Sequence, residues 1–98
     1  MTININKFQK DLKIKFRKKS LLLQALTHKS ANQKNNNEKL EFLGDRVIGL
    51  VLSKKLFDLY PQENEGVLDK RFANLVNGKI CCEIGCSIGI HNYIVTGN

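Results

Sequence analysis

Three carboxylates lie close together in the segment from Asn37 to Asp45, which reads NEKLEFLGD. On an α-helix, which advances about 100° per residue, Glu38, Glu41 and Asp45 stand at roughly 0°, 300° and 340°, within one arc of about 60°. Like charges that close repel one another unless a cation joins them. Carboxylate oxygens are also the ligands that a hard ion such as Mg²⁺ selects. The segment is therefore either a divalent-metal site or a structural stripe, paired with Lys or Arg of a neighbouring helix or open to solvent.

The residues around these acids are mostly apolar: Leu40, Phe42, Leu43, Val47, Ile48, Leu50, Val51 and Leu52. A helix with so little polar circumference is expected to be central and largely buried. In such a helix the three acids cannot all point freely into water.

The elements that must position the acids are predicted to be helices. The first of them carries apolar residues at helical spacing: Ile5, Phe8, Leu12 and Phe16. Ser20 is expected to cap a second helix, which runs through Leu26 and ends near His28.

The central helix is expected to follow the polar loop from Asn32 to Asn37. Asn35, with Glu38 three positions later, can start it with a capping box. The helix should continue to about Tyr60, because Pro61 prevents continuation.

The remaining chain also favours helices. After the loop PQENEG, an apolar pattern typical of a helix is carried by Val67, Leu68, Phe72, Leu75 and Val76. Gly78 marks a kink or break, and a further apolar segment spans Ile80 to Ile90. Val, Ile and Thr alternate nowhere except near Tyr93 to Thr96, so the expected fold class is all-α.

Length and charge narrow the class of protein. The 98 residues make one domain at most, and the net charge of +7 favours a polyanionic partner, either nucleic acid or membrane. Lys7, Lys10, Lys13 and Arg17 fall opposite the apolar side of the first helix, as a solvated face or a phosphate-contacting one. The apolar face is short and lacks Trp, which disfavours an amphipathic membrane helix.

Cys81, Cys82 and Cys86 are a poor disulfide framework and fit a reducing compartment. With His91 they permit a zinc site, but paired C-x-x-C spacing is absent, and we expect three small side chains on a buried helix. The sequence has no long apolar run and no apolar signal core near its start, so a cytoplasmic location without membrane contact is expected.

The run NEKLEFLGDRVIGLVL, with ALTHKS before it and PQENEG and RFANLV after it, resembles bacterial ribonuclease III in order and spacing. The resemblance covers roughly Leu21 to Ile94. It implies an all-helical nuclease domain that forms a homodimer and cleaves double-stranded RNA, including ribosomal and other RNA precursors. The family uses water activated by Mg²⁺, with Mn²⁺ as an alternative ion, and leaves 5′-phosphate and 3′-hydroxyl ends.

The resemblance also implies roles for individual residues. Glu41 resembles a direct metal ligand, and Asp45 resembles the essential acid that binds metal and positions its water. Glu38 and Glu65 resemble further acids that line the RNA-binding valley, with a weaker claim to catalysis. Phe42 resembles an aromatic residue of the dimer interface, with ordinary core packing as the alternative.

The sequence departs from the family pattern in two respects. A second acidic pair, D-x-x-E on a later helix, is missing, and so is the C-terminal double-stranded RNA-binding domain. Residues 1–98 are therefore expected to be the N-terminal part of a ribonuclease III nuclease domain, truncated at its C-terminus and inactive alone. The apolar flanks of the central helix should then be exposed.

Three functions compete. The first is a metal-dependent endoribonuclease on double-stranded RNA; the second is a non-catalytic RNA-binding or dimerisation module on the same scaffold. The third, a basic domain on anionic membrane, would require liposome binding without RNA affinity.

His28 is expected to be a structural residue rather than a general base, Lys29 is a candidate phosphate contact, and Arg46 can approach phosphate or solvent.

Overall fold

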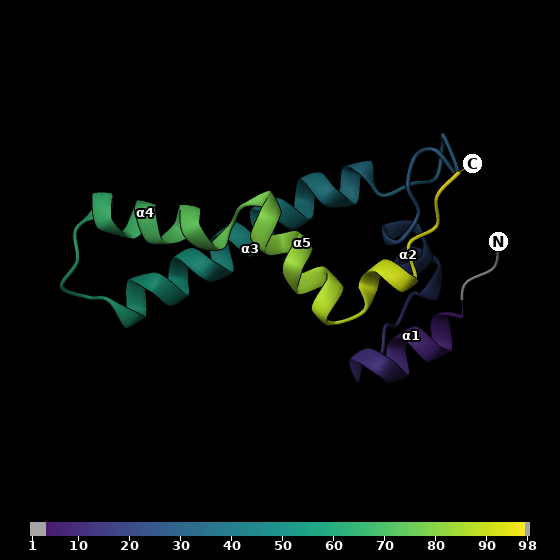
Figure 1. The fold of residues 1–98 in the computed structure, drawn as a ribbon, viewed down its shortest axis with the longest axis horizontal. Helices are drawn as coiled ribbons and strands as arrows, with labels where there is room; N and C mark the ends of the chain where they lie inside the picture. Colours follow the sequence, from purple (N-terminus) through teal and green to yellow (C-terminus); the bar gives the residue numbers. More distant parts are fainter. Residues whose placement is uncertain (1–3, 98) are drawn as a thin grey trace.

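The computed structural model describes residues 4–97 and has a helical architecture (Figure 1). Its elements are α1 (Ile5–Leu12), α2 (Lys19–Ala25), α3 (Glu38–Leu59), α4 (Glu65–Leu75), α5 (Gly78–Ser87) and the 3₁₀ turn η1 (Ile90–Asn92). The residues described contain one isolated parallel bridge, between Thr27 and Val95, and no longer strand. The predicted all-α class is confirmed.

The molecule is elongated, with extents of 50 × 27 × 23 Å. Helix α3 forms its long axis, and α4 folds back alongside the C-terminal half of α3 (Figure 1). Helices α1 and α2 pack together at the other end, and α5 leads back toward them through η1. The acids of α3 therefore lie between two separately packed ends.

The small core at the α1–α2 end is built from Phe8, Leu22 and Leu26, all less than 10% exposed. Ile5, Leu12, Ile90 and Tyr93 pack against it. The apolar side of α1 is thus covered by the protein itself, which argues against its use as a membrane-binding face. No helix in the described part of the chain is long and apolar enough to span a membrane.

Helix α1 is shorter than its apolar spacing predicts. It ends at Leu12 because Lys13 adopts a left-handed conformation with φ of 57°, and its amide N–H donates back to the carbonyls of Gln9 and Lys10. Phe16 therefore lies beyond the helix and is 40% exposed, so its placement on the apolar helical face was wrong.

Two predicted helix caps were also wrong. Helix α2 starts one residue before Ser20, with Lys18 at the N-cap and no side-chain cap bond. Helix α3 starts at Glu38 with Asn37 at the N-cap, and the Glu38 amide donates to Asn36 Oδ1 instead of taking part in a capping box with Asn35. In a tract of three consecutive asparagines, tertiary contacts select the one that ends the loop. The predicted end of α3 at about Tyr60 is confirmed, since Tyr60 is its C-cap.

The expected burial of α3 was wrong for the residues described. Leu56 is its one buried residue, while Leu50, Phe57 and Leu43 are 73%, 68% and 60% exposed. The physical reason is that α4 covers only part of the helix. The exposed apolar flanks match the alternative expectation from the missing part of the family domain.

The C-terminal segment is hydrogen-bonded to the start of the α2–α3 loop. Val95 donates its amide to Leu26 O at 2.9 Å and accepts the His28 amide at 2.8 Å. The Gly97 amide donates to Ser30 Oγ, and a Cβ at Gly97 would come within 2.2 Å of the Ser30 carbonyl oxygen. Glycine is therefore required at 97 for the close approach of the two backbones.

Candidate acidic site on helix α3

The three predicted acids all lie in the first eight residues of α3, so the helix places them on one stripe as the spacing implied. All three are exposed, which contradicts the expectation that they could not point freely into water. Glu38 is 3.6 Å from the ammonium of Lys29, and both side chains are about 60% exposed. An ion pair so exposed contributes little to stability.

Glu41 and Asp45 differ from Glu38, because their carboxylates make no hydrogen bond or ion pair with any residue from 4 to 97. They are four residues apart, so they stand about 6 Å apart along the helix axis. Two unpaired carboxylates on one exposed stripe form a region of negative potential that is open to a cation.

The start of α3 is fixed to the end of α2 by one backbone and one side-chain hydrogen bond. The Asn37 amide donates to Thr27 O at 2.9 Å, and Gln24 Nε2 donates to Asn36 O at 3.1 Å. The Thr27 hydroxyl is in turn bonded to Leu23 O. These bonds set the direction in which the acidic stripe leaves the α1–α2 core.

His28 has a structural place beside this junction. Its Nδ1 accepts the amide N–H of Ser30 at 3.1 Å and lies 2.7 Å from the Ser30 hydroxyl. Because this ring nitrogen already accepts a backbone hydrogen bond, it stabilises the turn and is not free to act as a base. The geometry agrees with the expected structural role of His28, and Lys29 is directed to Glu38.

The carboxylate oxygens of the stripe are of the type that binds a hard divalent ion, but there are few of them. No group of three or more His, Cys, Asp or Glu residues within the described chain is placed to hold a metal. Glu41 and Asp45 can supply at most two protein ligands, and Mg²⁺ commonly keeps several waters beside one or two carboxylates. The pair therefore fits a largely hydrated Mg²⁺ that is held weakly.

Glu65 is not brought to this stripe. It lies in the first turn of α4 and lines a pocket of about 590 Å³ with Ser53, Leu56 and Phe57 of α3. Ser53 is eight residues beyond Asp45, or about 12 Å along the helix. Asp69, one turn after Glu65, lines the same pocket, and the sequence interpretation missed it although its i,i+4 spacing from Glu65 was visible.

Phe42 is exposed by 56%, so the alternative of ordinary core packing was wrong for the described chain. The Arg46 guanidinium lies 3.8 Å from the centre of its ring and donates to the Phe42 carbonyl. Arg46 thus contacts the residue one turn before it on the same helix. It covers part of the Phe42 ring, which a dimer partner would have to contact.

The cysteines of α5 were expected on a buried helix, and this was wrong, because all three are exposed free thiols. The helix has few neighbours besides η1. Local desolvation, followed by the neighbouring Cys82 thiol, raises the pKa of Cys86. A raised pKa makes this thiol a poorer nucleophile and metal ligand at neutral pH.

With this geometry described, similarity to known proteins decides the family. Residues 18–98 match the family model described as ribonuclease-III-like. The chain belongs to this family. It is 54% identical over 98 residues to ribonuclease 3 of Pelagibacter ubique and 42% identical over 95 residues to that of Wolinella succinogenes. It spans 44% and 40% of the length of those two proteins.

Solved structures of ribonuclease III share the fold. The chain matches two structures of the nuclease domain from Campylobacter jejuni with TM-scores of 0.91 and 0.88, each at 42% identity over 96% of this chain. The match covers 66% and 64% of those domains. The first of them is described as showing structural flexibility in a region involved in dimer formation. The resemblance inferred from the NEKLEFLGD run is confirmed.

Proposed function

We propose that this chain carries part of the active site of a Mg²⁺-dependent endoribonuclease that cleaves double-stranded RNA. The observation that carries the proposal is the unpaired Glu41–Asp45 pair on the exposed stripe of α3, in a chain that belongs to the ribonuclease-III-like family. Four other acids, Asp11, Glu38, Asp58 and Glu63, each have a partner within residues 4–97. The two best-placed candidates for metal binding do not.

The roles of the residues follow from their positions. Glu41 and Asp45 would hold the ion, which supplies a Lewis acid and an activated water at the scissile phosphate. Glu38 would lie at the entrance to the stripe, where Lys29 offsets its charge and can contact a phosphate. Glu65 would act at a distance from the ion, on the RNA bound along α3.

The second half of the family's acidic set would have to come from residues outside this sequence. The whole protein would work as a cytoplasmic homodimer on ribosomal and other RNA precursors, with the Phe42 side of α3 at the interface. The exposure of Phe42 supports that assignment of the face.

The test is cleavage of a long double-stranded RNA with Mg²⁺ by the whole protein, which includes the residues outside this sequence, and by its Glu41→Gln and Asp45→Asn variants. Each substitution removes the charge with little change in shape and should lower cleavage by at least about 10²-fold, the scale on which loss of a positioned catalytic group is felt. Asp58→Asn, also on α3 but paired with Lys54, is the matched control and should leave the rate within about twofold. Equal cleavage by all four proteins would remove Glu41 and Asp45 from the mechanism.

A non-catalytic RNA-binding module remains the second candidate, and the absence of a three-ligand group among residues 4–97 favours it. It predicts tight binding of double-stranded RNA without Mg²⁺ and no cleavage with it. Binding that Glu41→Gln strengthens, with no cleavage by any variant, would support this candidate, because removing a carboxylate relieves repulsion of phosphate.

A further inference from the structure

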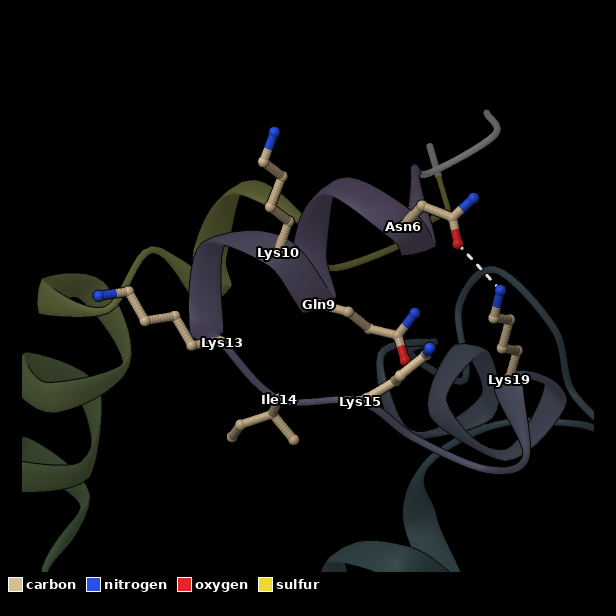
Figure 2. A pocket seen from close by; sticks show the side chains of 7 residues that line it. All are labelled: Asn6, Gln9, Lys10, Lys13, Ile14, Lys15 and Lys19. Atoms are coloured by element: carbon tan, nitrogen blue, oxygen red, sulfur yellow. Dashed lines mark hydrogen bonds between the residues drawn. The ribbon is translucent and has the colours of Figure 1, made fainter.

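A basic pocket lies between α1 and the start of α2, apart from the acidic stripe of α3 (Figure 2). Its volume is about 330 Å³, at the lower end of the range of about 300–1,000 Å³ for ligand pockets. Lys10, Lys13, Lys15 and Lys19 line it together with Asn6 and Gln9. No acidic side chain is part of the lining, so the pocket is suited to an anion.

The charge around this pocket is not neutralised locally. The first 37 residues carry nine Lys and Arg against Asp11 alone, whereas the rest of the chain has seven bases and eight acids. Asp11 accepts the Tyr93 hydroxyl at 2.6 Å and is not part of the pocket lining. Lys10, Lys13 and Lys15 form no ion pair within the described residues. Most of the positive excess therefore belongs to residues 6–19, the segment that builds the pocket, which carries seven bases and one acid.

Gln9 supplies a directed donor. It is only 8% exposed, and its Oε1 accepts the Phe16 amide at 2.7 Å, which fixes the orientation of the side-chain amide. The Nε2 group then carries two N–H donors with no partner from residues 4–97. Figure 2 shows the Gln9 side chain extending from α1 toward Lys15 and Lys19, while the Lys10 and Lys13 side chains extend away from Gln9. No buried side-chain nitrogen or oxygen of the described residues lacks a partner, so this Nε2 group reaches solvent and can donate to an acceptor that enters the pocket.

The pocket is partly pre-organised. Lys19 Nζ donates to Asn6 Oδ1 at 3.0 Å, which holds the ammonium at the pocket and leaves two of its N–H donors free (Figure 2). The left-handed Lys13 ends α1 and turns the chain, so that Lys13 and Lys15 both line the pocket. Helical spacing alone groups Lys10 and Lys13 with Lys7 and Arg17, and it misses Lys15 and Lys19, because the turn at Lys13 is not visible in the spacing.

We propose that this pocket binds a backbone phosphate of double-stranded RNA, as a contact separate from the α3 acids. This rests on the proposed function. Lysines act as point charges for phosphate, and the Gln9 side-chain amide, held in place by the Phe16 amide, adds a hydrogen bond to a phosphate oxygen. No lining residue in the described part of the chain is aromatic, so nothing there stacks a base. The contact is therefore independent of RNA sequence, and it anchors the duplex at the α1–α2 end.

The substitution that tests this phosphate contact most directly is Gln9→Glu. A carboxylate keeps the acceptor for the Phe16 amide but replaces the free donor with a negative charge inside the pocket. Binding of a double-stranded RNA, measured by fluorescence anisotropy in Ca²⁺ to prevent cleavage, should weaken by about tenfold or more, as expected for loss of a charge-assisted hydrogen bond. Gln62→Glu, which adds the same charge in an exposed loop, should change affinity by less than about twofold.

A second pair of variants distinguishes phosphate binding at this pocket from general electrostatic attraction of RNA to a basic protein. Lys10→Gln/Lys13→Gln/Lys15→Gln should lower the slope of log K against log salt concentration by about one for each phosphate that the variant no longer neutralises. The matched control, Lys55→Gln/Lys70→Gln/Lys79→Gln, removes three exposed charges elsewhere and should change the slope less. If both triple variants have native circular dichroism spectra and lower this slope equally, the proposal that the pocket binds phosphate is refuted.

Pyrophosphate provides a probe that does not depend on RNA. In ¹⁵N-resolved NMR spectra, the Gln9 Nε2 resonances should shift on titration with pyrophosphate in the wild type and stay unchanged in the triple pocket variant. No shift at Gln9 would overturn the phosphate site even if the protein cleaves RNA. A shift at Gln9, with RNA affinity that depends on the pocket but no cleavage by the whole protein, would support the pocket and refute the nuclease proposal.

Discussion

Arg71 is the residue that ties the loop after α3 to helix α4. Its guanidinium makes two hydrogen bonds of 2.6 Å to Glu63 and lies 3.7 Å from the centre of the Tyr60 ring. The hydrogen bonds from Arg71 hold the pKa of the Glu63 carboxyl below its usual value. Planar bidentate pairing of this kind is specific to arginine, so Lys at position 71 would not replace it.

The Glu63–Arg71 pair predicts a pH dependence of stability. A carboxyl whose pKa is lower in the folded state stabilises the fold above its unfolded pKa, and this stabilisation is lost as pH falls through the folded pKa. The melting temperature of the wild type should therefore exceed that of Glu63→Gln at neutral pH, and the difference should shrink as the pH falls below about 4.3, the ordinary pKa of a Glu side chain. Thermal melts followed by circular dichroism at several pH values measure this.

Glu83→Gln is the control for that series, because Glu83 is an exposed acid on α5 that makes no ion pair with residues 4–97. Its melting temperature should follow the wild type across the whole pH range. A difference between wild type and Glu63→Gln that stays constant with pH would show that the missing interaction is steric rather than ionic.

At the scale of elements, the local sequence pattern predicted some features of the helices, and the conformation of the folded chain determines the others. Apolar spacing and Pro61 were enough to predict the existence of the helices and the end of α3, because both depend on neighbours in sequence. The end of α1 depends on the left-handed conformation of Lys13, which apolar spacing does not encode. The start of α3 at Glu38 depends on a contact with another segment, the bond from Asn37 to Thr27. For the same reason the pattern predicted the Glu41–Asp45 stripe but not the separation of Glu65 from it.

Asparagine caps start helices α4 and α5. The Asn77 side chain accepts the Ile80 amide at 2.9 Å, while Asn37, at the start of α3, makes no cap bond through its side chain. Asn77→Ala should therefore lower the free energy of unfolding by about 0.5–2 kcal/mol, and Asn37→Ala should lower it by clearly less. Urea unfolding curves of the two variants measure the difference. Equal destabilisation at both positions would mean that intrinsic helix propensity, not the cap bond, sets the effect.

At the scale of the whole molecule, the apolar surface is distributed unevenly. Leu43, Leu50 and Phe57 are seven residues apart along α3 and form a stripe that is at least 60% exposed at each position. The compact α1–α2 core and the α3–α4 contact leave this stripe outside. Exposed apolar patches of this kind mark surfaces that bind another surface or associate. The chain spans less than half of its curated relatives' length, and the uncovered stripe is consistent with that.

This stripe predicts that residues 1–98 alone bind a hydrophobic dye and associate in solution. Leu50→Gln should lower dye fluorescence and the associated fraction without reducing the free energy of unfolding, because Leu50 is 73% exposed. Leu56→Ala, at the buried position of the same helix, should instead cost about 2–5 kcal/mol. Sedimentation velocity and dye titration measure association, and urea melts measure stability. A wild-type chain that is monomeric, binds no dye and unfolds cooperatively at high temperature would show that the stripe is covered within the chain itself.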